Sequence, residues 1–356
     1  MKTLLKTTSL FLLLILISCG NDDDNSNSPQ EMEIETASII GSWERISGTL
    51  LFAEPDYLHI ALDNTVTMLL EDDLGFRGEG KGNFTNTEGQ ITIQFGLGNP
   101  NILNYTIEDN ILELLQANGT ISTFIRNTEA PSSDEWITKL EILAQVDAPA
   151  GNAFTDIAFN GTHILLSNSQ SGNNIDLLNP ETLTLDGEII TTLATQAVEV
   201  EKFDLPDKYI FQRFSGVSTT IQANFENTNE EAFTSIELGS SIFGLASINS
   251  TQIWLSSPGS LSLLDYTFIN SQVIERTIPL EQASINGLDY QDGLLYVCSN
   301  GNIYKCDVSS SFQILEAIQL EGFRANGIAF DGTNFWINAS SIISGSHQII
   351  KTNLTL

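Results

Sequence analysis

The feature that most constrains the fold is a repeat of about 43 residues in the C-terminal part of this 356-residue chain. Four copies of an apolar strand–turn–strand pattern can be aligned. Their equivalent positions are Asp156, Gly244, Gly287 and Gly327, which are separated by 88, 43 and 40 residues. Because the first gap is twice the others, we expect a degenerate copy near residues 200–211.

Each repeat contains four short apolar runs separated by turns, the pattern of a β-propeller with four-stranded blades. The sequence therefore predicts an all-β fold with a five-bladed β-propeller over residues 137–356. The last copy ends with its third strand, near residues 348–353. Residues 140–146 resemble the fourth-strand segment 314–320. We therefore expect residues 138–146 to complete the last blade and to remove its open edges.

Residues 38–127 carry a second β pattern, about eight short strands separated by turn residues. It predicts a small antiparallel barrel. The opening Gly41-Ser42-Trp43 and the closing Phe124-Ile125-Arg126 resemble the ends of a lipocalin-like domain. The resemblance implies that Trp43 closes the barrel floor and that Arg126 lies across it as a cation–π pair. It also implies a cup for an apolar ligand, but the short strands favour a barrel filled by its own side chains.

The first 18 residues predict that the chain is exported. Lys2 and Lys6 precede an unbroken apolar run over residues 10–17, which is too short to span a bilayer and is typical of a secretory signal peptide. The run ends in Leu16-Ile17-Ser18-Cys19, which resembles the lipobox of bacterial lipoproteins. This resemblance implies cleavage before Cys19, diacylation of its thiol and attachment to a membrane through the lipid. The alternative is an ordinary signal peptide followed by a chance cysteine.

Two polar segments separate the anchor, the barrel and the propeller. Residues 19–37 are rich in Asp, Asn, Ser and Glu and predict a disordered acidic tether. Within it, residues 21–25 resemble the acidic export tag of Bacteroidetes-type surface lipoproteins, which implies a surface-exposed place on the outer membrane; the alternative is a solvated charge run. Residues 128–136 contain Ala130-Pro131-Ser132-Ser133 and predict a linker.

The charge balance excludes two classes of partner. The chain has 45 Asp and Glu against 14 Lys and Arg, a net charge of −31. Nucleic-acid binding needs clustered basic residues to neutralise phosphates, and docking on an anionic membrane surface needs them too. We therefore expect no nucleic-acid partner. The partner that we expect at the cell surface is a peptide, glycan or protein, because the propeller mouth offers a surface of that size.

The cysteines and histidines predict neither a disulfide nor a metal site. Asn300-Gly301 between two apolar runs predicts a two-residue hairpin. Its register places Cys298 and Cys306 on opposite faces of the sheet, so we expect two free, buried thiols. The three histidines are scattered along the sequence: His59, His163 and His347. No metal-ligand spacing results, and we expect no metal and no cofactor.

The repeats also resemble a known enzyme family. In order and spacing, four segments look like the five-bladed glutaminyl-peptide cyclotransferase propellers: residues 152–155, 243–245, 285–290 and 326–329. Those enzymes cyclise N-terminal glutamine with carboxylates at the channel mouth. Here Gly287 and Ser241 stand where the family has Glu, and only Asp289 keeps an acid. Without positioned acid and base groups the proton transfers lose their catalyst.

These observations predict a non-catalytic outer-membrane lipoprotein that binds or scaffolds through the propeller mouth. We expect ligand-binding residues in the inner strands and the loops before them: Asp156, Phe243, Asn286, Arg324 and Asn326. A turn or core role is the alternative for each of them. Two other functions remain open, a glutaminyl-peptide cyclotransferase-like or other propeller enzyme, and a small apolar-ligand carrier that uses the barrel.

Overall fold

The structure, a computed structural model, describes most of the chain after the N-terminal segment. The described residues are 38–50, 53–95, 99–148, 154–168, 174–190, 195–201, 208–214, 219–225, 231–232, 242–265, 273–280 and 284–356. The predicted signal peptide, Cys19 and the predicted tether lie outside them. Ser38–Leu356 form one compact unit.

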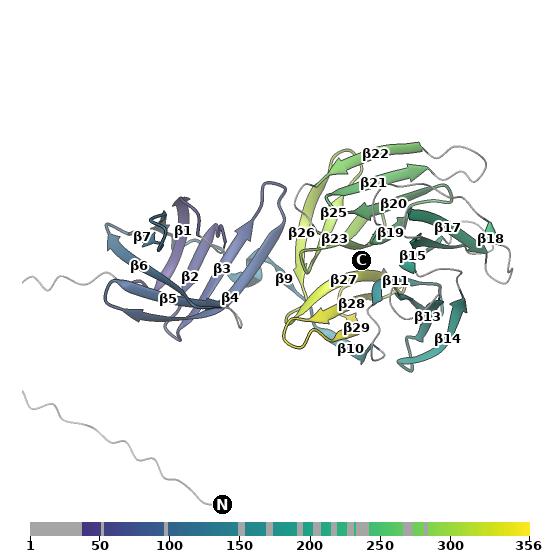
Figure 1. Cartoon of the computed structure of the whole chain (residues 1–356), viewed down its shortest axis with the longest axis horizontal. Coiled ribbons are helices and arrows are strands. Elements are labelled where there is room, and N and C mark those ends of the chain that lie inside the picture. The colour runs from purple at the N-terminus through teal and green to yellow at the C-terminus, as the bar shows by residue number, and fades with distance from the viewer. Residues whose placement is uncertain are drawn as a thin grey trace, which may run out of the picture. The chain divides into compact units, whose positions relative to one another are not determined.

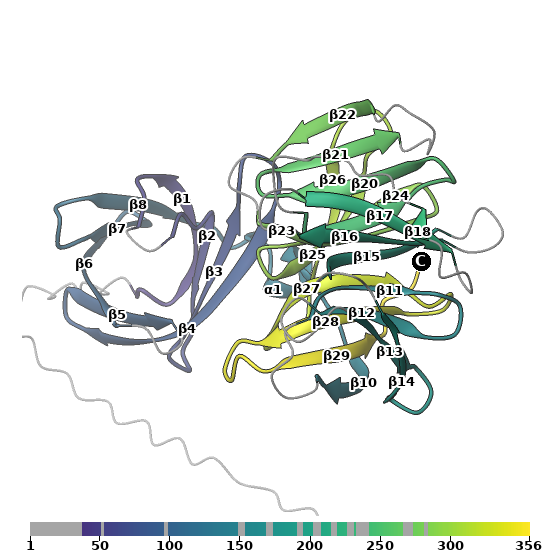
Figure 2. The ribbon, with the colours of Figure 1, turned by 45° about the vertical axis from the view of Figure 1, so that its right-hand side comes forward.

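The N-terminal β region is a closed antiparallel barrel of eight strands, as the sequence predicts (Figure 2). Consecutive strands pair, and β8 closes the barrel on β1. The strands are β1 (Gly41–Ser47), β2 (Tyr57–Ile60), β3 (Thr65–Glu71), β4 (Arg77–Thr87), β5 (Gln90–Phe95), β6 (Asn101–Glu108), β7 (Ile111–Leu115) and β8 (Ile121–Arg126). The alternation of apolar and polar residues sends every second side chain inward, which is why the strands close around a core.

The two ends of the barrel meet at Trp43 and Arg126. These residues pair across β1 and β8, and Arg126 Cζ lies 4.3 Å from the centroid of the buried Trp43 ring. Arg126 also donates hydrogen bonds to the carbonyl oxygens of Ile40 and Ser38, at 2.9 and 2.6 Å. The segment before β1 is therefore held against the barrel by one side chain.

Apolar side chains fill the described interior of the barrel. The buried cluster joins all eight strands: Trp43, Leu58, Ile60, Val66, Met68, Phe84, Ile91, Ile93, Leu103, Leu112, Leu114 and Phe124, together with Ile39 and Leu50. Burial of this many apolar groups from every strand supplies the driving force for closing the barrel.

The C-terminal region is a propeller-like ring of small antiparallel sheets (Figure 1). One sheet holds β11 (Phe154–Phe159), β12 (Ile164–Asn168), β13 (Asn174–Asn179) and β14 (Thr184–Ile190). The next holds β15 (Thr195–Glu201), β16 (Lys208–Phe214), β17 (Thr219–Phe225) and β18 (Glu231–Ala232), where the degenerate copy was expected. A third holds β19 (Gly244–Ser247), β20 (Gln252–Ser257), β21 (Ser260–Asp265) and β22 (Val273–Pro279).

One of the two remaining sheets shows that the prediction of five uniform four-stranded blades is wrong, because it has a fifth strand. Four strands of one are β23 (Ile285–Gln291), β24 (Leu294–Ser299), β25 (Asn302–Asp307) and β26 (Gln313–Gln319). The fifth is β9 (Thr138–Lys139), which pairs in parallel with β26. The other sheet holds β27 (Phe323–Phe330), β28 (Phe335–Ser341), β29 (His347–Thr352) and β10 (Ile142–Asp147). The ring thus has four sheets of four strands and one of five.

The closure of the ring was predicted in part. β10 pairs antiparallel with β29, so the segment that precedes the first repeat does supply the missing strand of the last sheet. Residues 138 and 139, assigned by the sequence to the same strand, instead lie beside β26, with Thr138 opposite Ile318. The chain covers the edge of one sheet and then crosses to the next. Both edges are thereby paired, which a single longer strand could not achieve.

The linker contains a short helix that the sequence prediction missed. α1 (Ser133–Trp136) begins with a capping box, in which Ser132 and Glu135 satisfy each other's backbone N–H groups. Trp136 is buried, and its ring lies edge-on to Tyr57, with centroids 5.6 Å apart. Arg77 Cζ lies 4.7 Å from the Trp136 ring centroid. The linker is anchored on the barrel by this aromatic side chain.

The cysteine prediction is confirmed. Cys298 pairs with Ile303 and Leu295 with Cys306 across the Asn300-Gly301 turn, so the two thiols lie on opposite faces. Both cysteines are free and buried, and burial raises the pKa of each thiol. They are neutral at physiological pH and poorly reactive.

Candidate functional site

The equivalent positions of the repeat meet at the axis of the ring. Figure 1 shows the innermost strands β11, β15, β19, β23 and β27 surrounding this axis. Asp156 belongs to β11, whereas Gly244, Gly287 and Gly327 belong to β19, β23 and β27. Three of the four aligned positions therefore carry no side chain at the point where the inner strands come closest.

The close approach of the inner strands requires these glycines. A Cβ atom on Gly287 would lie 2.4 Å from Gly327 Cα, and one on Gly244 would lie 2.3 Å from the carbonyl oxygen of Asn286. Both distances are shorter than real Cβ contacts, and the atoms met are backbone atoms that cannot turn away. No side chain fits at 287 in this backbone, and this explains physically why the Glu of the cyclotransferase pattern does not stand there.

Asp156 is the aligned residue that keeps a side chain. It is 0% exposed, and its Oδ2 accepts a hydrogen bond from the Val198 N–H on β15 at 3.3 Å. Its Oδ1 has no hydrogen-bond partner among the described residues and lies 3.1 Å from the ideal Cβ position of Gly287. Burial raises the pKa of Asp156 well above its ordinary value, against the lowering effect of backbone N–H groups. Burial at the axis therefore favours the neutral form of this carboxyl group.

The other predicted site residues lie at the starts of inner strands, which we call the mouth: Phe243, Asn286, Arg324 and Asn326. Phe243, Asn286 and Asn326 are half-buried, and Arg324 is exposed. A side chain links two neighbouring sheets at this level, since the hydroxyl group of Ser256 on β20 donates to the carbonyl oxygen of Asn286 on β23 at 2.6 Å. The structure thus separates Asp156, sealed at the axis, from the mouth residues.

Asp289, the acid that the cyclotransferase resemblance retains, is also buried. It is 7% exposed, and its Oδ1 accepts a hydrogen bond from Gln291 Nε2 at 2.8 Å. A general acid or base must reach the proton it transfers, directly or through one water. Burial keeps the carboxylates of Asp156 and Asp289 from a substrate at the mouth.

A cavity of about 490 Å³ lies beside the mouth, and Arg324 is part of its wall. From the ring, the wall takes Asn300, Gly301, Asn302, Tyr304, Gln319, Phe323, Arg324 and Ile342. From the barrel it takes Ala53, Glu54, Met68, Leu70, Glu71, Asp72 and residues 76–80. Of these residues only Arg324 was predicted from the sequence, because the wall is assembled from segments more than 200 residues apart. The Asn300-Gly301 turn was the one local signal, and it indicated only a hairpin.

A tip of the barrel packs into the same region. Phe76 belongs to the buried core cluster of the ring, and its ring is edge-on to that of Tyr304, with centroids 4.7 Å apart. Tyr304 Oη donates a hydrogen bond to the carbonyl oxygen of Arg77 at 2.7 Å, and Asn302 Nδ2 donates to the same oxygen at 3.2 Å. The aromatic floor of the cavity is fixed by these contacts.

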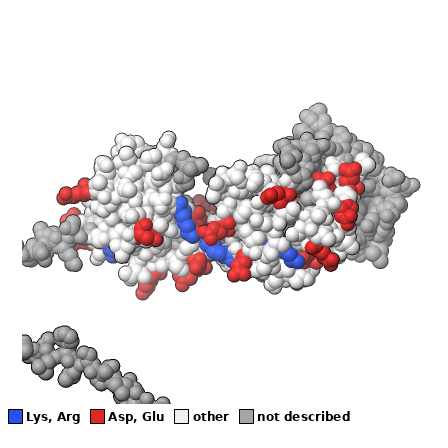
Figure 3. All heavy atoms as spheres, turned by 90° about the horizontal axis from the view of Figure 1, so that it is seen from below, with Lys and Arg blue, Asp and Glu red and all other residues white. Residues whose placement is uncertain are grey.

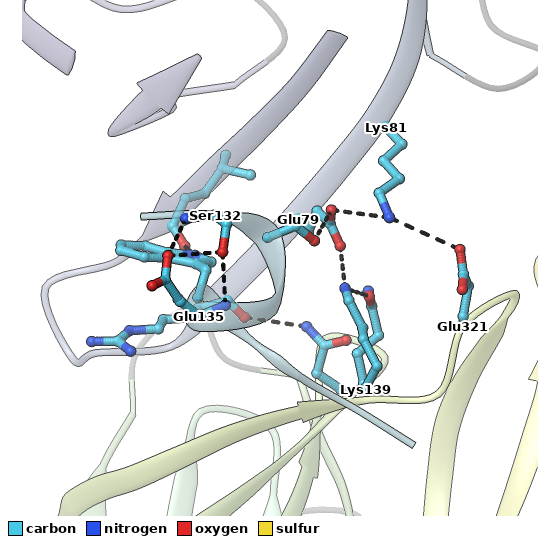
Figure 4. Close-up of polar contacts among 12 residues, drawn as sticks. Glu79, Lys81, Ser132, Glu135, Lys139 and Glu321 are labelled. Atoms are coloured by element: carbon cyan, nitrogen blue, oxygen red, sulfur yellow. Dashed lines mark hydrogen bonds and ion pairs between the residues drawn. The ribbon is translucent and has the colours of Figure 1, made fainter. Parts of the chain in front are cut away.

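A buried ion pair lies next to the cavity (Figure 4). The Glu79 side chain on β4 is 3% exposed and accepts hydrogen bonds from Lys139 Nζ and from Ser133 Oγ. Lys81 Nζ lies 3.3 Å from Glu79 and 3.9 Å from Glu321. Burial acts to raise the pKa of Glu79, but the hydrogen bonds and the lysine charges outweigh it, and the pKa lies below its ordinary value. This carboxylate is charged and fully engaged, which indicates a structural role.

The remaining features of the surface are acidic. On the face shown in Figure 3 acidic side chains are widely scattered, and basic ones gather along a line across its middle.

Among the described residues, no three His, Cys, Asp or Glu side chains form a group that could hold a metal ion. In the same residues we find no helix with the length and apolar character needed to cross a membrane.

Comparisons with known proteins add no family assignment. No protein-family model matches the chain, and no curated protein matches it.

Proposed function

We propose that this chain is a non-catalytic, lipid-anchored protein of the outer membrane that binds its partner at the propeller mouth. In this proposal the ring is a five-bladed relative of the cyclotransferase propellers, and the barrel is a lipocalin-like domain with a structural role. The anchor is the lipidated Cys19, and the tether gives the folded part its reach.

Burial of the acids near the ring axis carries the proposal. Asp156 is fully buried and its pKa is raised, Asp289 is buried, and the backbone at Gly287 has no room for a carboxylate. Binding needs only accessible groups, and the exposed Arg324 beside a cavity supplies one. The filled interior of the barrel supports the structural role over that of an apolar-ligand carrier.

A turnover assay tests the absence of catalysis. The full mature chain is incubated with a peptide that has an N-terminal glutamine and an amidated C-terminus, and loss of ammonia is followed by mass spectrometry. We expect no turnover above the buffer rate. Turnover that disappears in Asp289→Asn would overturn the proposal, since it would make that carboxylate a working acid or base.

Lipidation is tested separately by labelling cells with an alkyne fatty acid. The wild-type chain should take up the label, and Cys19→Ser should not. Label retained by Cys19→Ser would disprove the anchor and leave the binding part of the proposal standing.

A further inference from the structure

Arg324, in the cavity wall, differs from the other Lys and Arg side chains that the structure describes. Among the Lys and Arg side chains that the structure describes, Arg324 alone has no ion-pair, hydrogen-bond or ring partner. The partnered ones are Arg45, Arg77, Lys81, Arg126, Lys139, Arg276, Lys305 and Lys351. A guanidinium left without a carboxylate offers an external anion a local charged partner, although the chain as a whole has a net charge of −31.

The acids of the same wall divide into engaged and open groups. Glu71 pairs with Arg77 at 2.8 Å, Asp72 accepts the backbone N–H groups of Leu74 and Phe76, and Glu79 is held by Lys139. Glu54 is exposed, and no partner for it lies among the described residues. The cavity thus offers one open cation on its ring side and one open anion on its barrel side.

We propose, building on the function given above, that this cavity binds a short peptide through its free C-terminal carboxylate. The Arg324 guanidinium group binds the carboxylate in a bidentate manner, by donating two parallel hydrogen bonds to its oxygens. Glu54 accepts an N–H or ammonium group of the same peptide. Arg324 is thereby a ligand-binding residue, in the place where the sequence predicted one.

The uncharged part of the wall suits a peptide. Met68, Leu70 and Ala53 are apolar, and an ideal Cβ on Gly78 has no heavy atom within 4 Å, so there is open space next to them. This space takes the side chain of the C-terminal residue. Asn300 and Gln319 carry amides, which both donate to and accept from peptide groups.

A sugar acid would bring the same carboxylate, but the wall suits it less. Sugars stack on open aromatic faces, whereas two of the three aromatic rings of the wall, Phe76 and Tyr304, are 5% and 1% exposed and packed edge-to-face on each other. Only Phe323 is half-buried. The open anion at Glu54 also matches the ammonium group of a peptide, a positive charge that a uronic acid does not carry.

Calorimetric titration of the full mature chain tests the proposal. The probes are the tripeptide Gly-Ala-Leu, its C-terminal amide and glucuronate. We expect the free acid to bind at least tenfold more tightly than the amide, because a hydrogen-bonded charge is removed. Binding of the free acid should weaken with salt, since Arg324 is exposed.

Three variants locate the binding. Arg324→Gln should abolish the difference between acid and amide. Arg276→Gln, which removes an equal charge outside the cavity wall, should leave the affinity unchanged. Gly78→Leu fills the open space and should prevent binding of both peptides. Circular dichroism checks that Gly78→Leu folds. If Gly78→Leu does not fold, the result for Arg324→Gln decides the test.

The outcomes separate this inference from the proposed function. Equal affinity for acid and amide, unchanged binding by Arg324→Gln, absence of any binding at millimolar peptide, or tighter binding of glucuronate would each overturn it. None of these results depends on turnover, because the cyclisation substrate has an amidated C-terminus. Conversely, cyclisation of that substrate would refute the proposed function whatever Gly-Ala-Leu does.

Discussion

The neutral carboxyl group at the ring axis gives the sharpest test of how the ring is held together. Asp156→Asn keeps the shape of the side chain and removes its ability to ionise. In the folded state the Asp156 carboxyl group is fully buried, which raises its pKa, and the charge of Glu199 raises it further. The nearby Asp289 and Cys298 are also buried. In the unfolded state it is exposed and has its ordinary pKa. Folding therefore favours the protonated form.

The sign and size of the effect follow from proton linkage. A carboxyl whose folded pKa is raised contributes stability that is complete below the unfolded pKa, near 3.8, and is lost as the pH rises through the folded pKa. In that window the wild-type chain loses about 1.4 kcal/mol of unfolding free energy per pH unit, and the Asn variant loses nothing at this position. The free energy of unfolding of Asp156→Asn should therefore increase relative to that of the wild type as the pH rises.

Urea unfolding at pH 4, 5, 6 and 7, followed by tryptophan fluorescence, measures this difference. Asp292→Asn makes the same substitution in an exposed turn and should show no such trend. If the difference between wild type and Asp156→Asn were the same at every pH, the carboxyl group would be ionised throughout, and our account of a neutral group at the axis would be wrong.

Four further substitutions test the packing and the buried ion pair. Gly287→Ala should cost about 1–3 kcal/mol, because its Cβ meets Gly327 Cα at 2.4 Å; chemical denaturation measures this, and an unchanged midpoint would contradict the closed axis. Phe76→Ala should cost about 3–5 kcal/mol and loosen the Tyr304 region, visible as faster hydrogen exchange; slow exchange there would refute the contact. Lys139→Met should cost about 3–5 kcal/mol, and adding Glu79→Gln should restore most of it, whereas additive losses would show that the two residues are not coupled. The lowered pKa of Glu79 stabilises the fold above its unfolded pKa and ceases to do so as the pH falls, so Glu79→Gln should be less sensitive to acid.

The sequence predicted those parts of the fold that depend on local patterns. Strand alternation and turn residues located the eight barrel strands, and the spacing of Asp156, Gly244, Gly287 and Gly327 located the sheets of the ring. The Asn300-Gly301 turn fixed the register that separates the two thiols, because a two-residue turn leaves one pairing.

The features that the sequence did not predict depend on long-range contacts. β9 is two residues long and joins β26, which is about 180 residues away, so no local pattern could assign it. α1 is too short for a helical period, and its capping box is visible only when Ser132 is read together with Glu135. The cavity wall combines barrel and ring residues, and from the sequence only Arg324 was identifiable.

The glycines that reveal the repeat also bear on its chemistry. A ring whose inner strands touch backbone to backbone needs residues without Cβ at the axis, and three of the four aligned positions meet that need. The same condition removes carboxylates from the position where the cyclotransferase pattern has one, and the acid at the remaining aligned position, Asp156, is buried with a raised pKa. We therefore expect a ligand of the ring to be recognised outside the axis, where side chains are free to project. The unpaired Arg324 beside the cavity meets that condition, and its loss should abolish recognition of a carboxylate without affecting the ring.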